Sequence, residues 1–183
     1  MRIISGSKRG ASIKPPPNLP VRPITDRNKE SLFNILANDY DFEELTVLDL
    51  FSGTGNVAFE FASRGAAEVI AVDGDAKCVK FIRQQTEKFG FDNMETEQAN
   101  VLQFLGSDFR EYDIIFADPP FKWPDYEKMI KLVYSEKLIK PGGLFITEHY
   151  KTLSLDHLPG FRNQRKYGQT RMSFFCREEE IEK

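Results

Sequence analysis

The sequence predicts an α/β protein with a seven-stranded, mostly parallel sheet, helices on both faces and a C-terminal antiparallel hairpin. Three observations lead to this fold class. From residue 46 onward, short apolar runs typical of strands alternate with segments of helical spacing. The first run ends in a glycine-rich loop, and the last two runs flank a Gly-Gln turn. Regular alternation favours a parallel sheet, whereas a tight turn between two strands requires antiparallel pairing.

Each element is expected from its own signal. Residues 1–4 and 11–13 have the pattern of a small β-hairpin, and three prolines then extend the chain. Thr25 or Asp26 can cap the first helix, and a Pro-Gly-Gly turn is expected at 141–143. Strands are expected at residues 46–51, 67–73, 94–99, 112–118, 144–148, 161–167 and 170–176, and further helices at 55–64, 76–89 and 126–135. Residues 1–24 are interpreted as a dependent N-terminal hairpin and arm, and residues 25–183 as one domain.

The composition is that of an ordinary globular protein, with 183 residues and a net charge of −3. No apolar run approaches the roughly 20 residues of a membrane span, and the first residues lack a signal-peptide core, so a cytoplasmic protein is expected. Cys78 and Cys176 lie far apart, and only two histidines are present. We therefore expect both cysteines to be small buried hydrophobes, and we expect no metal site.

The charges are unevenly distributed along the chain. Residues 1–30 hold seven basic and two acidic side chains, and residues 157–177 hold five basic side chains and no acid. Basic ends around an acidic middle suggest a polyanionic partner that contacts the ends. Charge scattered over a solvated surface remains an equal alternative on composition alone.

The glycine-rich loop after the first strand suits a small cofactor. Gly53, Gly55 and Ala58 match a dinucleotide fingerprint, with an acid, Asp73, at the end of the second strand. However, Asp49 would repel the pyrophosphate that such a loop cradles at a helix N-terminus. S-adenosylmethionine carries an ammonium and a sulfonium instead of phosphates, and Asp73 would accept hydrogen bonds from its ribose. The sequence therefore favours S-adenosylmethionine over NAD or a purely structural turn.

The fourth strand ends in a carboxylate and two prolines, at the sheet edge where α/β proteins bind ligands. The Asp118 carboxylate can accept one N–H of an exocyclic amine, the Pro119 carbonyl can accept the other, and Phe121 can stack on the base. This arrangement works by positioning and electrostatics, without a strong base. Carbon methylation of cytosine would need a cysteine nucleophile here, and this stretch has none. The structural alternative is a strand-end turn with a hydrophobic plug.

Several sequence motifs resemble those of a known enzyme family. DLFSGTG followed by DPPF resembles the class I methyltransferases, which have a Rossmann-like fold. MRIISGSKRGASI, VRPITDRNKESLFNIL and KYGQTRMSFF extend the resemblance over nearly the whole chain, to the RsmD family of 16S rRNA guanine-N2 methyltransferases. The resemblance implies transfer of a methyl group from S-adenosylmethionine to the N2 atom of a guanine. It also implies a monomer that acts on the small ribosomal subunit or its assembly intermediate.

The resemblance also implies roles for individual residues. The catalytic residues would be Asp118, Pro119 and Phe121. The cofactor would contact Asp49, Phe51, Gly53, Gly55, Asp73, Gly74, Asn100 and Val101. The family often has Glu at the position of Asp73 and usually has Asp at the position of Asn100. RNA would contact Lys8, Arg9, Arg22, Thr25, Arg27 and Lys122, because phosphate contacts supply most nucleic-acid affinity.

Two alternatives use the same motifs. A DNA adenine-N6 or protein glutamine methyltransferase has a related loop, but a DNA enzyme usually adds a recognition domain that this chain has no room for. An inactive scaffold that binds S-adenosylmethionine or RNA is the non-enzymatic alternative, and the intact Asp49 and Asp118 argue against it.

Overall fold

The computed structural model describes residues 1–17, 19 and 24–177, so Arg22 lies outside the described residues. The chain divides into two compact units, Met1–Ala99 and Asn100–Lys183. Within the described ranges, no helix has both the length and the apolar character that a membrane span would require.

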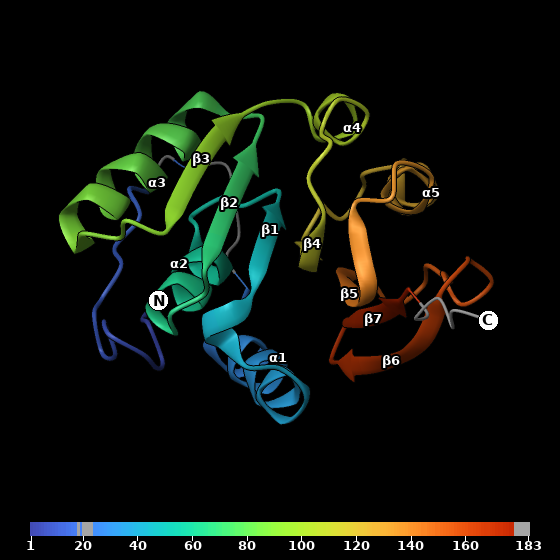
Figure 1. The fold of residues 1–183 in the computed structure, drawn as a ribbon, viewed down its shortest axis with the longest axis horizontal. Coiled ribbons are helices and arrows are strands. Elements are labelled where there is room, and N and C mark those ends of the chain that lie inside the picture. The colour runs from blue at the N-terminus through green and yellow to red at the C-terminus, as the bar shows by residue number, and fades with distance from the viewer. Residues whose placement is uncertain (18, 20–23, 178–183) are drawn as a thin grey trace. The chain divides into compact units, whose positions relative to one another are not determined.

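The first unit contains a parallel three-stranded sheet (Figure 1). Its elements are α1 (Asp26–Asp39), the 3-10 helix η1 (Phe42–Glu44), β1 (Thr46–Leu50), α2 (Asn56–Ser63), β2 (Glu68–Asp73), α3 (Ala76–Phe89) and β3 (Met94–Gln98). The strand order is β3-β2-β1, α2 packs on β1 and β2, and α3 packs on β2 and β3. Because Asp49 is in register with Ala71, the ends of β1 and β2 meet at one edge of the sheet.

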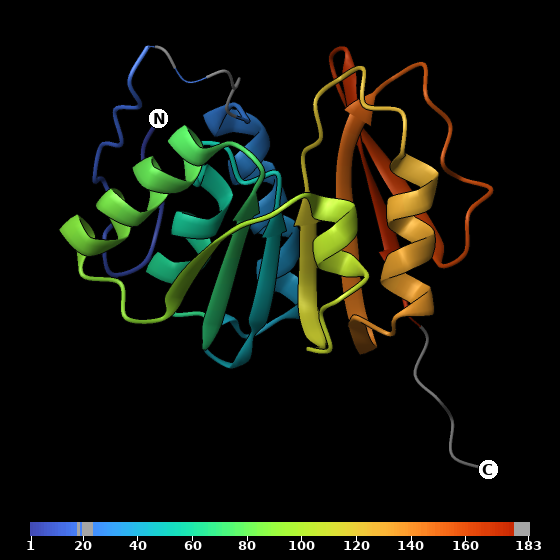
Figure 2. The ribbon, with the colours of Figure 1, turned by 90° about the horizontal axis from the view of Figure 1, so that it is seen from above.

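The second unit contains a mixed four-stranded sheet. Its elements are α4 (Val101–Leu105), β4 (Tyr112–Ala117), α5 (Tyr126–Ser135), β5 (Ile139–Tyr150), β6 (Phe161–Tyr167) and β7 (Thr170–Cys176). The order is β4-β5-β7-β6, with β4 and β5 parallel and the β5–β7 and β6–β7 pairs antiparallel. Figure 2 shows α4 and α5 on the same side of β4 and β5.

The α/β class, the seven strands and the C-terminal antiparallel hairpin are confirmed. Three details differ from the expectation. The N-terminal hairpin is reduced to one isolated bridge, Arg2 to Ser12. The turn expected at 141–143 lies inside β5, where the register to β4 shifts between the Tyr112 and Ile114 pairs, so the glycines form an irregularity within a strand. The five-residue helix α4 was not expected, because it is too short to show a period.

A buried ion pair anchors the N-terminal arm to the first unit. Lys29 on α1 is fully buried, and its Nζ donates to the Arg2 carbonyl (2.6 Å) and to Asn56 Oδ1 (2.8 Å). The same Nζ lies 3.5 Å from Oε2 of Glu60 on α2. Burial lowers the pKa of Lys29 even though the Glu60 carboxylate acts in the opposite direction. Several hydrogen bonds to the polar atoms of the pair therefore offset the cost of removing both charges from water.

The Glu60 carboxylate also binds the arm directly. Its oxygens accept hydrogen bonds from the backbone N–H groups of Ile4 (2.7 Å) and Ser5 (3.0 Å). Beyond them Gly6, at φ +82°, packs so closely on α2 that a Cβ atom would lie 1.8 Å from the Ser63 carbonyl oxygen. Only glycine fits this position, which brings the arm into contact with the helix.

We predict that Glu60→Gln destabilises the protein by about 3–5 kcal/mol, because it leaves the Lys29 ammonium buried without its countercharge. Denaturant unfolding followed by circular dichroism measures the change. The matched control is Glu127→Gln on α5, which breaks the exposed pair with Lys131 (3.4 Å) and should change stability by about 0.5 kcal/mol or less. Equal effects of the two variants would show that Lys29 does not depend on Glu60.

Candidate active site

The first part of the candidate site lies at the carboxyl ends of β1 and β2. Asp49 is only 2% exposed, and its Oδ2 accepts a hydrogen bond from the N–H of Ala58 on α2 (3.1 Å). Burial raises the pKa of Asp49 to about 8, the Asp73 carboxylate adds to the increase, and the Ala58 N–H opposes it. A buried carboxylate of this kind is stabilised in its ionised form by a cationic ligand.

The loop between β1 and α2 has an unusual backbone. Phe51, Gly53 and Gly55 have φ values of 57°, 55° and 72°, three left-handed residues within five positions. Phe51 is the non-glycine among them, and a positive φ at a non-glycine residue often marks a functional site. A Cβ atom on Gly55 would lie 2.7 Å from the Phe59 ring, so this position at the start of α2 excludes a side chain. At Gly53 and Gly55 the loop has no side chain between its backbone and a ligand, so a close approach is possible.

Asp73 is fixed by the same loop. Its Oδ2 accepts from the N–H of Gly53 (2.8 Å), and its Oδ1 accepts from the N–H of Asp75 (2.8 Å). Each carboxylate oxygen can accept a second hydrogen bond, so Asp73 retains capacity for two ligand hydroxyls. Gly74, the next residue, is exposed. The carboxylate therefore has a fixed orientation, as recognition of a diol would require.

Cys78 lies near this part of the site but is not a candidate nucleophile. Burial, followed by the carboxylates of Asp73 and Asp75, raises the pKa of Cys78 to about 12. A thiol in this state is inert near neutral pH. Cys78 is fully buried as expected, whereas Cys176 is only half-buried.

Asn100 and Val101 begin the second unit. The Asn100 Oδ1 accepts hydrogen bonds from the N–H groups of Leu102 (3.0 Å) and Gln103 (3.2 Å), so it caps α4. Its side-chain NH2 group is the part that remains for a ligand. Val101 is buried.

The second part of the candidate site is the loop that follows β4. Asp118 is half-buried, Pro119 is buried, and Phe121 is 48% exposed. The Trp123 N–H donates to the Pro120 carbonyl (2.7 Å), which closes the turn. The Phe121 ring lies 5.8 Å from that of Tyr150 at the end of β5, in an edge-to-face arrangement. The loop thus combines a half-buried carboxylate, a rigid backbone and an accessible aromatic ring.

Three further polar side chains near Asp118 were missed in the sequence. Tyr126 is 3% exposed, and no described residue forms a hydrogen bond to its hydroxyl group. Burial raises the pKa of Tyr126, and the carboxylates of Asp118 and Glu148 act in the same direction, which places both in its electrostatic environment. Glu148 Oε1 accepts from the Thr170 hydroxyl (2.7 Å), and His149 Nε2 lies 2.8 Å from Ser173 Oγ. The sequence did offer a signal for two of them, since Glu148 and His149 stand just before the last residue of β5, the strand next to β4.

The residues expected to contact RNA differ in their exposure to solvent. Arg9, Arg27 and Lys122 are exposed, whereas Lys8 is half-buried. Thr25 caps α1, since its Oγ1 accepts from the Asn28 N–H (3.2 Å). In the part of the chain that the structure describes, no three His, Cys, Asp or Glu side chains gather closely enough to hold a metal ion.

The chain is similar to known proteins along nearly its whole length. The family described as conserved hypothetical protein 95 matches residues 1–176. YlbH of Bacillus subtilis is 31% identical over 96% of this chain and 98% of its own length. "Ribosomal RNA small subunit methyltransferase D" of Buchnera aphidicola is 31% identical over 84% of this chain and 78% of its own. The solved structure of yhhF from Escherichia coli has a TM-score of 0.88 and 28% identity, over 98% of this chain and 99% of that one.

We predict that Asp49 makes stability depend on pH. Its pKa of about 8 in the folded protein exceeds the value of about 3.9 in the unfolded chain. Between these values the folded state binds the extra proton, so the contribution of Asp49 to stability falls as pH rises, and it stops falling above the folded pKa. Between pH 6 and pH 8, the free energy of unfolding of the wild-type protein should fall by about 2 kcal/mol relative to that of Asp49→Asn. Urea unfolding of both proteins at each pH measures this, and a pH-independent difference would contradict it.

Proposed function

This chain belongs to the RsmD family, and from that premise we propose that it methylates the exocyclic N2 of a guanine in 16S rRNA. It is an S-adenosylmethionine-dependent rRNA methyltransferase. The observation that carries the proposal for an exocyclic amine is the loop from Asp118 to Phe121 at the end of β4, with its half-buried carboxylate and exposed ring. A monomer acting in the cytoplasm is part of the proposal.

The residues of the first unit fit the cofactor. A buried carboxylate with a raised pKa, Asp49, calls for a cationic ligand, and the backbone at Gly53 and Gly55 permits close approach. We propose that these residues, with Phe51, hold the methionine part, and that Asp73 with Gly74 holds the ribose. Asn100 and Val101 would border the adenine, with Asn100 offering its NH2 group. When bound, S-adenosylmethionine supplies an electrophilic methyl group on a positively charged sulfur.

The residues of the second unit would prepare the acceptor. The lone pair of a guanine N2 amine is delocalised into the ring, so this nitrogen is a weak nucleophile. An N–H bonded to the Asp118 carboxylate and another bonded to the Pro119 carbonyl would fix the amine and stabilise the positive charge that develops on it. Phe121 would stack on the base. The extra proton on the methylated nitrogen is acidic, and Asp118 is placed to accept it.

The target is proposed to be a guanine of the small ribosomal subunit or of its assembly intermediate. Chemistry on a base requires that the base leave its stack, and an exposed RNA loop makes this less costly. The exposed Arg9, Arg27 and Lys122, with Lys8, Arg22 and Thr25, are proposed to contact the RNA. No separate domain for reading duplex DNA is present in the fold described, so target choice is proposed to rest on the shape of the particle.

The proposal is tested with labelled S-adenosylmethionine and small subunits from cells that lack this protein. We predict label in the RNA, at a guanine located by mass mapping, and none in genomic DNA or glutamine-containing peptide. Asp118→Asn should lower kcat by about 10²–10³, because a neutral amide no longer stabilises the positive charge that develops on the amine, while cofactor affinity stays within about threefold.

The control is Asp125→Asn, the same change seven residues along the same connection, which should leave kcat within about twofold. Label in DNA or peptide instead of subunits would contradict the substrate. Full activity of Asp118→Asn would contradict the role given to the carboxylate.

A further inference from the structure

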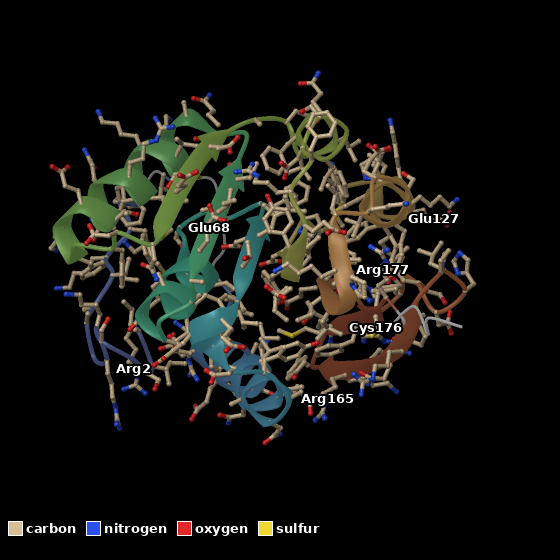
Figure 3. All side chains as sticks on the ribbon, viewed as in Figure 1. Arg2, Glu68, Glu127, Arg165, Cys176 and Arg177 are labelled. Carbon is tan, nitrogen blue, oxygen red and sulfur yellow. The ribbon has the colours of Figure 1, made fainter. Side chains whose placement is uncertain are left out.

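The hairpin of β6 and β7 carries an unusual group of cations, which we call the hairpin cations: Arg165, Lys166 and Arg171. Residues 162–166 of β6 are all exposed, so neither face of the strand centre is covered, whereas residues 172–175 of β7 are buried. Figure 3 labels Arg165 on β6. A strand with both faces exposed offers its side chains to a partner and not to the core.

The charges within this hairpin oppose one another. Lys166 and Arg171 are directly paired across the antiparallel strands, a like-charge arrangement that destabilises a hairpin. Arg171 donates from Nη1 to the neutral amide of Gln164 (3.2 Å), while its buried Nε has no hydrogen-bond partner among the described residues. Asp156, an exposed residue of the loop between β5 and β6, is within electrostatic range of Arg171, as is His149.

No described carboxylate lies within ion-pair distance of Arg165, Lys166 or Arg171, whereas Lys29, Arg64, Arg110, Lys131, Lys140 and Arg177 all have such a partner. Unpaired charge on an edge strand can serve to prevent edge-to-edge aggregation. That purpose needs no second cation directly opposite the first. The combination of like-charge repulsion and exposure indicates an anionic partner that is supplied from outside the chain.

The strand register places these cations at the edge of the second unit's sheet where β4 ends and the Asp118 loop begins. Ala117, just before Asp118, pairs with Thr147 on β5, and two residues further along β5 His149 pairs with Arg171. Arg171 in turn pairs with Lys166. The cations therefore stand level with the Asp118 loop, and three strand spacings separate β4 from β6, about 14 Å. A short stretch of RNA backbone can span that separation.

We propose that Lys166 and Arg171, which share one face of the hairpin, form a phosphate-binding site that holds the RNA strand beside the target guanine, and that Arg165, on the opposite face of β6, adds to the positive field around it. The inference rests on the proposed function, because it takes RNA as the substrate. Arginine binds phosphate through paired N–H groups, and lysine adds a compact charge. Phosphate contacts position a nucleic acid without reading its sequence, so the site contributes affinity and orientation, not chemistry.

The decisive variant is Lys166→Glu, because it changes binding and stability in opposite directions. A glutamate opposite Arg171 replaces repulsion by attraction, so the melting temperature should stay equal or rise. The KM for small subunits should nevertheless rise about tenfold or more, with kcat for bound substrate within about twofold. The slope of log affinity against log salt should become shallower by about 1–2.

The matched comparison uses two double variants with the same charge loss. Arg165→Gln/Lys166→Gln removes two hairpin cations, and Lys77→Gln/Lys80→Gln removes two exposed lysines from α3. The first should raise KM about tenfold and flatten the salt dependence, and the second should change KM less than about threefold. Equal effects of the two doubles, or an unchanged KM for Lys166→Glu, would overturn the phosphate site.

The activity of the wild-type protein separates a failure of the proposed function from a failure of the phosphate site alone. If wild-type protein leaves small subunits unlabelled, the proposed function fails and the hairpin cations lose their RNA ligand with it. If wild-type protein labels the subunits and the hairpin variants match it in KM and in salt slope, only the phosphate site fails.

Discussion

Parallel pairing is the constraint on which both parts of the candidate site depend. Because β1 and β2 run in the same direction, Asp49 and Asp73 come to the same edge, where the Gly53 N–H joins the Asp73 carboxylate to the loop after β1. Because β4 and β5 are also parallel, the Asp118 loop and the Glu148 end of β5 share an edge within the second unit. Neither constellation is contiguous in sequence, so strand direction alone assembles each of them.

The protein handles its buried charges in two ways. Lys29 and Glu60 lie together in the interior, and their remaining polar atoms bind Asn56 and the backbone of the arm. Asp49 has the Ala58 N–H but no cationic partner among the described residues of the first unit, and its pKa rises accordingly. The Lys29–Glu60 pair stabilises the fold, whereas Asp49 lacks a positive partner that a cationic ligand can supply.

The sequence predicted those features that depend on local pattern. Most strands were recognisable because they have a short apolar run, and the polar β6 was recognisable from the Gly-Gln turn that follows it. Thr25 was recognisable as a cap because its residue type and position suffice. The DPPF loop was recognisable because proline cannot continue a ladder. Features that depend on neighbours distant in sequence were not predicted. The Lys29–Glu60 pair, the environment of Tyr126 and the Lys166–Arg171 pair all arise from register or helix packing. The absorption of Pro141-Gly142-Gly143 into β5 likewise depends on β4 alongside it.

The close packing of Gly6 on Ser63 has a consequence for how the protein opens. Since the amides of Ile4, Ser5 and Lys8 donate to side chains of α2, and that of Ser7 donates to the Ser63 carbonyl, detachment of residues 4–8 would break four hydrogen bonds to the helix. The arm and α2 therefore belong to one cooperative unit, and its amides should exchange with solvent as slowly as those of the helix. A terminal segment that would ordinarily fray is in this way as persistent as the interior element on which it lies.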